Sequence, residues 1–201
     1  MEFSGNATVE NDFIYLVMNK PVGYVCSAVS DSHSTVYELL PQEMQKLVQN
    51  AKRGHRLHTI GRLDADTSGL LLFTDDGYFS HNLTAPDCHV SKTYVAKLAR
   101  PVTNAEKQIY QRRTAEGILL PPEKKAEEYL TQPAKLDFLA DDVCRLTIQE
   151  GKFHQVRRMI AALGNEVVEL TRVAVGELTL DETLKPGEWR KLSEGEVQLL
   201  R

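Results

Sequence analysis

Short apolar runs, rather than long amphipathic repeats, dominate the pattern of hydrophobic and polar positions along the chain. Runs of about four to eight apolar or alternating residues that end at Gly, Pro, Asn or Asp are typical of strands. By this criterion strands are predicted over 14–18, 24–27, 57–60, 70–74, 90–99, 135–139, 144–149, 167–170 and 175–180. Strands therefore account for most of the regular structure that the pattern predicts.

Helical spacing is confined to fewer segments. Apolar residues three and four positions apart predict helices over 35–49, 78–84 and 156–163. In the first of these segments, Pro41 interrupts the pattern. Capping residues predict two further helices, which begin after Thr103 and Ser193, each with a Glu three positions later.

The order of these elements favours one fold class. Strands outnumber helices and do not alternate with them regularly, which favours an α+β fold over a doubly wound one. We expect a mixed, mostly antiparallel central sheet flanked by helices and loops, with a catalytic cleft. Residues 1–12 are polar and aperiodic and predict a flexible tail, so 13–201 is expected to form one catalytic domain.

Composition narrows the class of protein. The chain has 201 residues, of which 42% are hydrophobic and 26% charged, and these ordinary values exclude a disordered or fibrous protein. No apolar run approaches the ~18 residues of a membrane helix. The three cysteines contain no CxxC pair, which excludes a disulfide framework and argues against structural zinc. A cytoplasmic protein is therefore expected.

Positive charge is clustered although the net charge is −4. Basic residues gather over 51–63 and 151–159, and acidic residues over 122–128 and 181–196. Such segregation suits a groove that follows a phosphate backbone. Two solvated surface segments would show the same pattern, so charge alone leaves both interpretations open.

The densest chemical signal is the polar loop 61–69, GRLDADTSG, between two apolar strands. Its terminal glycines permit tight turns, and the flanking strands hold the loop still. Such a loop presents the Asp64 carboxylate on a rigid support, as nucleophilic or acid–base catalysis requires. A hairpin loop whose Asp and Thr side chains bond their own backbone is the structural alternative.

The stretch 61–77, GRLDADTSGLLLFTDDG, resembles the signature loop of the bacterial rRNA and tRNA pseudouridine synthases. Further segments resemble the motifs of this family in the same order, namely 19–23, 92–94, 150–159 and 165–190. The resemblance extends over about 13–201, and residues 24–36 are most similar to the branch that modifies 16S rRNA. Ordered motifs on this scale are far more specific than one loop.

The resemblance implies roles for three catalytic residues. Asp64 would be the nucleophile or the base that activates the ribose, and Arg157 would pair with it and keep it ionised. Tyr94 would lie against the target uracil, although its position in a strand equally suits a core residue. Whether Asp64 adds to C6, attacks C1′ or removes the C2′ proton stays open.

Other residues are expected at the RNA. Arg62 lies two positions before Asp64, so in an extended segment both face the same side, and Arg62 would enter the stack that a flipped uridine leaves. Candidates for contacts with the RNA backbone are Lys20, Lys92, His154, Gln155 and Arg158.

The same resemblance predicts that no cofactor and no metal are needed, since pseudouridine formation has no net redox change and no group donor. His81, Cys88 and His89 supply too few ligands for a zinc site. The expected partner of a monomeric enzyme is ribosomal RNA or a small-subunit assembly intermediate, with no membrane. The small S4 RNA-binding domain that usually begins the family is expected to be absent.

Three alternatives stay open. The chain could carry out the same chemistry on 23S rRNA, act as a catalytically inactive RNA-binding module in ribosome assembly, or hydrolyse a substrate through Asp64 and Asp66.

Overall fold

The computed structural model describes residues 13–30, 32–49, 56–123 and 126–201. The expected tail, 1–12, and the basic residues at 52, 53 and 55 lie outside these ranges. The strands of the main sheet are β1 (Tyr15–Lys20), β2 (His58–Ile60), β3 (Thr67–Thr74), β4 (Lys92–Leu98), β7 (Lys135–Ala140), β8 (Val143–Ile148), β9 (Val167–Val175), β10 (Leu178–Thr179) and β11 (Trp189–Lys191). A separate pair consists of β5 (Leu119–Leu120) and β6 (Tyr129–Leu130).

The helices lie outside this sheet and cover parts of it. The α-helices are α1 (Gln42–Gln49), α2 (Gly77–Thr84), α3 (Asn104–Glu116), α4 (Gln155–Ala162) and α5 (Glu194–Leu199). Two short 3₁₀ helices, η1 (Val36–Leu39) and η2 (Pro86–Cys88), complete the regular structure. None of these helices combines the length and apolarity that crossing a lipid bilayer requires.

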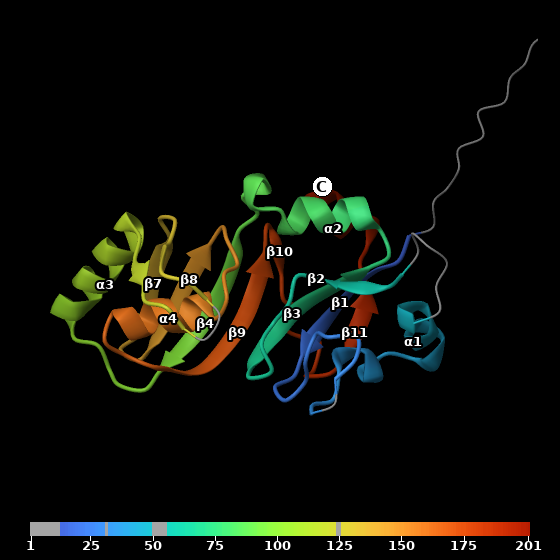
Figure 1. Cartoon of the computed structure of the whole chain (residues 1–201), viewed down its shortest axis with the longest axis horizontal. Helices are drawn as coiled ribbons and strands as arrows, with labels where there is room; N and C mark the ends of the chain where they lie inside the picture. The colour runs from blue at the N-terminus through green and yellow to red at the C-terminus, as the bar shows by residue number, and fades with distance from the viewer. Residues whose placement is uncertain (1–12, 31, 50–55, 124–125) are drawn as a thin grey trace, which may run out of the picture.

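The nine-stranded sheet runs the length of the molecule in the order β11-β1-β3-β9-β4-β8-β7, with β2 beside β3 and β10 beside β9 (Figure 1). All pairs are antiparallel except β3 with β9, where Gly69 lies opposite Arg172. This parallel pair joins a half built on β1 and β3 to a half built on β4, β8 and β9. It forms the central seam of the fold.

Gly69 explains how closely the strands approach at this seam. Its φ is +102°, and a Cβ built at this position would lie 2.2 Å from the main-chain oxygen of Arg172. A larger residue would be strained by its backbone angle and would collide with β9. The glycine in the loop motif therefore brings the two halves of the sheet together.

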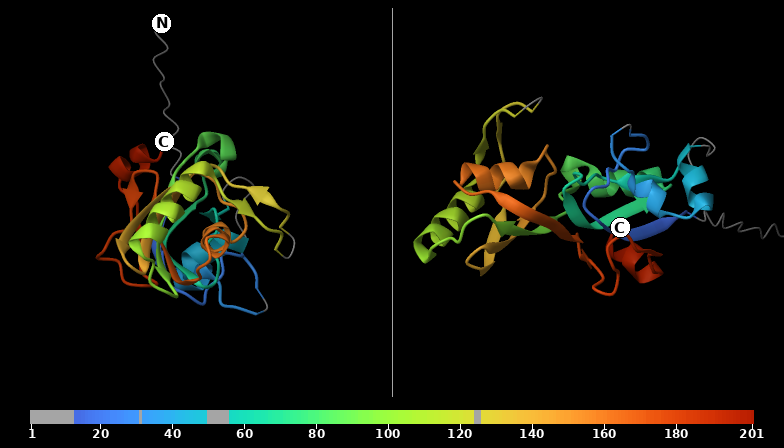
Figure 2. Two further views of the ribbon diagram at one scale, coloured as in Figure 1. Left: turned by 90° about the vertical axis from the view of Figure 1, so that its left-hand side faces the viewer. Right: turned by 90° about the horizontal axis from the view of Figure 1, so that it is seen from below.

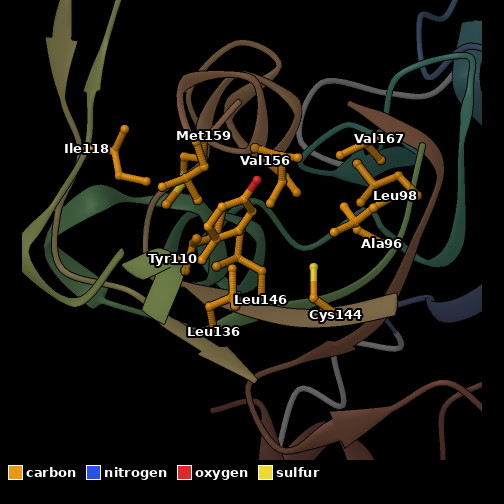
Figure 3. Packing of buried hydrophobic residues seen from close by; sticks show 14 of the residues in the cluster. Ala96, Leu98, Tyr110, Ile118, Leu136, Cys144, Leu146, Val156, Met159 and Val167 are labelled. Carbon is orange, nitrogen blue, oxygen red and sulfur yellow. The ribbon is translucent and has the colours of Figure 1, made fainter. Parts of the chain in front are cut away.

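Separate apolar clusters stabilise the two halves. In one half, side chains from α3 and α4 pack with those of β4, β8 and β9, and Tyr110, Leu146 and Met159 lie at the centre of this cluster (Figure 3). In the other half, β1 and β3 contribute to two clusters, one with η1 and α1 and one with α2 and α5. The arm of β5 and β6 projects away from the sheet (Figure 2, right).

The α+β class and the mixed, mostly antiparallel sheet are confirmed. The predicted helices are present, and Pro41 divides the first into η1 and α1. The separate strands predicted over 167–170 and 175–180 are wrong, because β9 continues through Thr171 and Arg172. The strand predicted over 24–27 is also wrong, since Val25 makes only an isolated bridge to Thr35.

Candidate active site

A pocket of about 470 Å³ opens at the seam between the two halves of the sheet. Its walls come from the loop before β3, from β4 and β9, and from the segment that leads into α4. This volume lies in the range of small-molecule sites in proteins, which bury most of the ligand that they bind. The pocket brings together segments that are far apart in the sequence.

The loop that carries Asp64 is held by Lys20. The Lys20 side chain is fully buried, and its Nζ donates hydrogen bonds to the main-chain oxygens of Pro21, Asp64 and Thr67 at 3.0, 3.0 and 2.7 Å. Desolvation by burial lowers the pKa of Lys20. Each carbonyl gains a charge-assisted bond, so the loop backbone converges on one buried ammonium group.

Two further contacts fix the same loop. The main-chain N–H of Gly23 donates to the oxygen of Ala65 at 2.7 Å. The buried Cys26 thiol accepts a hydrogen bond from the N–H of Leu63 at 3.3 Å. Because Leu63 is also buried, the backbone of the next residue, Asp64, is held in place.

The Asp64 carboxylate faces the pocket from this fixed backbone. Its side chain is 41% exposed, and its Oδ1 lies 3.7 Å from Nε2 of His154. His154 in turn places its Nδ1 3.4 Å from Oε1 of Glu123. A carboxylate that is both accessible and rigidly supported can act as a nucleophile or as a base.

The ion pair predicted between Arg157 and Asp64 is not the one that forms. Nη2 of Arg157 lies 3.0 Å from Oδ2 of Asp66 and also donates to the main-chain oxygen of Asp66, while Nη1 donates to the oxygen of Val167. These acceptors hold the guanidinium between the loop and β9. Arg157 still lines the pocket, and it holds the Asp64 loop through Asp66.

Arg62, Tyr94 and Lys92 lie in the pocket wall as expected from the sequence. Arg62 is exposed, whereas Tyr94 packs against the apolar clusters of both halves and lines the pocket as well. Tyr94 can therefore pack in the core and also face a substrate in the pocket. Lys92 is partly buried, and desolvation, followed by the charge of Arg172, lowers its pKa.

Three residues predicted to contact the RNA backbone, Lys20, Gln155 and Arg158, are buried, and their side chains bond to the protein itself. The Gln155 side chain is buried and bonds Glu150 and the N–H of Lys152. Arg158 is buried and donates to the main-chain oxygens of Phe153 and Pro121. Because these bonds are made within the protein, the three side chains stabilise the structure around the pocket.

His154 lies at the point where the pocket wall turns into α4. It precedes α4 in the left-handed conformation, with a φ of 47°, and its ring stacks on Phe153. Residues other than glycine adopt this backbone conformation rarely, and histidine is among those that do so more often. The imidazole lies between the Asp64 carboxylate, which lines the pocket, and the Glu123 carboxylate.

Sequence reasoning missed residues at the pocket floor and rim. Tyr129 donates from its hydroxyl to Glu150 at 2.5 Å, and this bond raises the pKa of Tyr129 to about 12. Arg172 is only 4% exposed yet lines the pocket, and its Nε donates to the main-chain oxygen of Leu70 at 2.8 Å. The sequence signal that could have indicated Arg172 is its position as a basic residue within the largely apolar run of β9.

Within the part of the chain that the structure describes, no group of three or more His, Cys, Asp or Glu side chains lies where it could hold an ion.

Comparison with known proteins gives consistent results. Residues 14–162 match the family described as RNA pseudouridylate synthase. The chain is 45% identical over 186 residues to ribosomal small subunit pseudouridine synthase A of Haemophilus influenzae, covering 92% of this chain and 73% of that protein. It is 44% identical over 183 residues to the protein of the same name from Escherichia coli K12, covering 91% and 72%.

This chain is also similar to solved structures. One described as a crystal structure of pseudouridylate synthase superimposes with a TM-score of 0.82 at 44% identity, over 94% of this chain and 74% of that one. A chain of a Cbf5-Nop10-Gar1 complex gives a TM-score of 0.56 at 20% identity, over 86% of this chain and 52% of that one. The second likeness shows a shared fold.

Proposed function

This chain belongs to the RNA pseudouridylate synthase family, and on that premise we propose that it converts one uridine of 16S ribosomal RNA to pseudouridine, with Asp64 as the reacting group. The identity of 44–45% to small-subunit synthases supports 16S RNA as the substrate. The observation that carries the proposal is an accessible Asp64 carboxylate in a pocket, on a loop clamped from below by Lys20.

The reaction begins with access to the base. A uridine in RNA must leave its stack before its glycosidic bond can be reached, at a cost of roughly a few kcal/mol. Arg62 is exposed at the pocket wall and can occupy the position that the base leaves. Its planar guanidinium can stack on the neighbouring bases and offset part of that cost.

The pocket then holds the uracil between Asp64 and Tyr94. The Tyr94 ring, packed against both apolar clusters, supports the face of the base. Asp64 breaks the bond between N1 and C1′ by one of the three routes that the sequence leaves open, and the base rejoins the ribose through C5. Arg157 contributes by holding the loop through Asp66.

The proposal specifies a partner and a compartment. Ribosomal RNA, free or in a small-subunit assembly intermediate, binds a monomeric enzyme in the cytoplasm. Arg62, Lys92 and His154 line the pocket and face the RNA, whereas the domain expected from the sequence, 13–201, supplies the whole catalytic unit.

Mapping of pseudouridine in rRNA tests the proposal. Carbodiimide-stop sequencing of rRNA from cells that lack this protein should show one 16S uridine unmodified, and purified protein should restore the modification in vitro. Loss of a 23S position would favour the alternative substrate. If no position changes although the protein binds rRNA, the chain is an inactive binding module and the proposal fails.

A further inference from the structure

Arg172 occupies the centre of the seam. It lies on β9, opposite Tyr94 of β4 and opposite Gly69 of β3. Its side chain is almost completely buried, and it lines the same pocket as Asp64 and Tyr94. A guanidinium group therefore forms part of the pocket floor, next to the ring that is proposed to support the base.

Only part of the hydrogen-bonding capacity of this guanidinium is used. Nε donates to the main-chain oxygen of Leu70, whereas Nη2 is buried and has no hydrogen-bond partner. No acidic side chain among the described residues forms an ion pair with Arg172. Buried donors are nearly always satisfied, and a buried charge without a partner is costly, so an unsatisfied guanidinium at a pocket floor points to a ligand.

We propose that Arg172 donates a hydrogen bond from the free end of its guanidinium to a carbonyl oxygen of the flipped uracil, and that it stabilises the negative charge that develops on this ring during the reaction. This inference rests on the proposed function, which it extends to the recognition of the base. It makes Arg172 a catalytic residue in addition to Asp64.

Depth and rigidity favour the base over an RNA phosphate as the ligand of Arg172. The residue is 4% exposed, whereas Arg62 and Lys152 are exposed at the pocket rim and can follow the backbone. The bond to Leu70 and the close approach at Gly69 fix the position of Arg172. A fixed planar donor suits the edge of a base, and phosphates are bound well by mobile side chains at a rim.

The reaction places negative charge on the carbonyl oxygens of the uracil, which this hydrogen bond would stabilise. When the bond between C1′ and N1 breaks, its electron pair stays on the ring and spreads to the carbonyl oxygens. Addition of Asp64 to C6 likewise places charge on a carbonyl oxygen. The ring then bonds to C1′ through C5, C5 loses its proton and N1 gains one, so substrate and product are isomers. A donor aimed at this oxygen stabilises the charged state more than the substrate.

A combined change in protein and substrate tests the contact. The target uridine of an rRNA fragment is replaced by 2-thiouridine or 4-thiouridine, whose sulfur is a weak acceptor, and single-turnover conversion is measured for wild type and Arg172→Gln. Arg172→Gln should slow conversion of the normal fragment by roughly 100-fold, with RNA affinity changed less than about threefold. Arg145→Gln, an exposed arginine of β8 outside the pocket lining, is the matched control and should retain wild-type rates.

The thio effect separates contact from structural support. One of the two thio substitutions should slow the wild type more than it slows Arg172→Gln, because the variant has already lost the bond. Equal thio effects in both proteins, or an unchanged rate in folded Arg172→Gln, would overturn the inference while leaving the proposed function intact. If Arg172→Gln does not fold, the same comparison is made with Arg172→Lys. A wild type that converts no uridine in rRNA would refute both proposals.

Discussion

Two lysines near the pocket, one behind the loop 61–69 and one in the strand wall formed by β4, differ in what their ammonium groups contact. Behind the loop that carries Asp64, Lys20 is fully buried and donates to four main-chain oxygens, three of them within the segment 61–69. In the strand wall, Lys92 is partly buried, faces the pocket and makes no hydrogen bond or ion pair to the described residues. Both lysines belong to segments that resemble family motifs, yet one supports the protein and the other is free to bind substrate.

His154 and the first turn of α4 show the same division within five residues. Arg158 and Gln155 bond inward, whereas His154 reaches toward Asp64. Membership of a motif therefore does not determine which basic side chains have donors free for a ligand. Burial and the number of internal acceptors decide it, because a basic side chain whose donors are occupied by carbonyls has none left for phosphate.

Substitution of Lys20 should have the largest effect on stability. Lys20→Met leaves the carbonyls of Asp64 and Thr67 buried without their donor, and we expect the free energy of unfolding to fall by roughly 3 kcal/mol. For a chain of this size the melting temperature would drop by about 6–12 °C. Thermal unfolding followed by circular dichroism measures this, with Lys92→Met as the matched control. A drop of less than about 2 °C for Lys20→Met would show that the buried ammonium is dispensable.

The ion pair between Arg190 and Glu196 lies away from the pocket, so its loss should change stability and leave the conversion of RNA unchanged. Hydrogen bonds from Arg190 lower the pKa of Glu196 to about 2 from the ordinary 4.5. A depressed carboxyl pKa stabilises the fold above pH 4.5, and this contribution disappears as the pH falls through about 2.

Glu196→Gln should therefore lower the free energy of unfolding by roughly 2 kcal/mol at pH 7 and by almost nothing near pH 2. Denaturant titrations at the two pH values check this difference. Conversion of rRNA at 25 °C should be unchanged, because Glu196 does not line the pocket. A loss of stability that is independent of pH would contradict the assignment of this ion pair.

Lys92 should show the smallest effect, and in binding rather than in folding. Lys92→Met removes a cation that forms no hydrogen bond or ion pair with the described residues, so the unfolding free energy should change by less than about 0.5 kcal/mol. RNA affinity should weaken by roughly fivefold, and the slope of log affinity against log salt should decrease by about 1. Filter binding across a salt series measures both. An unchanged slope would remove Lys92 from the RNA interface.

Much of the fold could be predicted from periodicity and capping. The capping box of Thr103 and Glu106 begins α3, and the one of Ser193 and Glu196 begins α5. β9 was divided in two because Thr171 and Arg172 interrupt its apolar pattern, and the interruption marks the pocket floor. β5 and β6 have two residues each, which is too short for any periodic signal.

The site could be predicted less completely than the fold. The motif loop brings Asp64 and Arg62, and the segment 92–94 brings Tyr94, into one pocket. The burial of Lys20 could not be predicted, because lysine is almost never fully buried and its acceptors come from a loop more than forty positions away. The partner of Arg157 depends on a difference of two positions between Asp64 and Asp66, which only the three-dimensional arrangement of the loop resolves.

The central claim is that the Asp64 carboxylate is the group that reacts with the target uridine. The most direct test is single-turnover conversion of 16S rRNA by Asp64→Asn, a nearly isosteric change on a partly exposed side chain. We expect conversion to become undetectable, RNA affinity to stay within about threefold, and the melting temperature to shift by no more than about 2 °C. Conversion at more than about a tenth of the wild-type rate would contradict the claim.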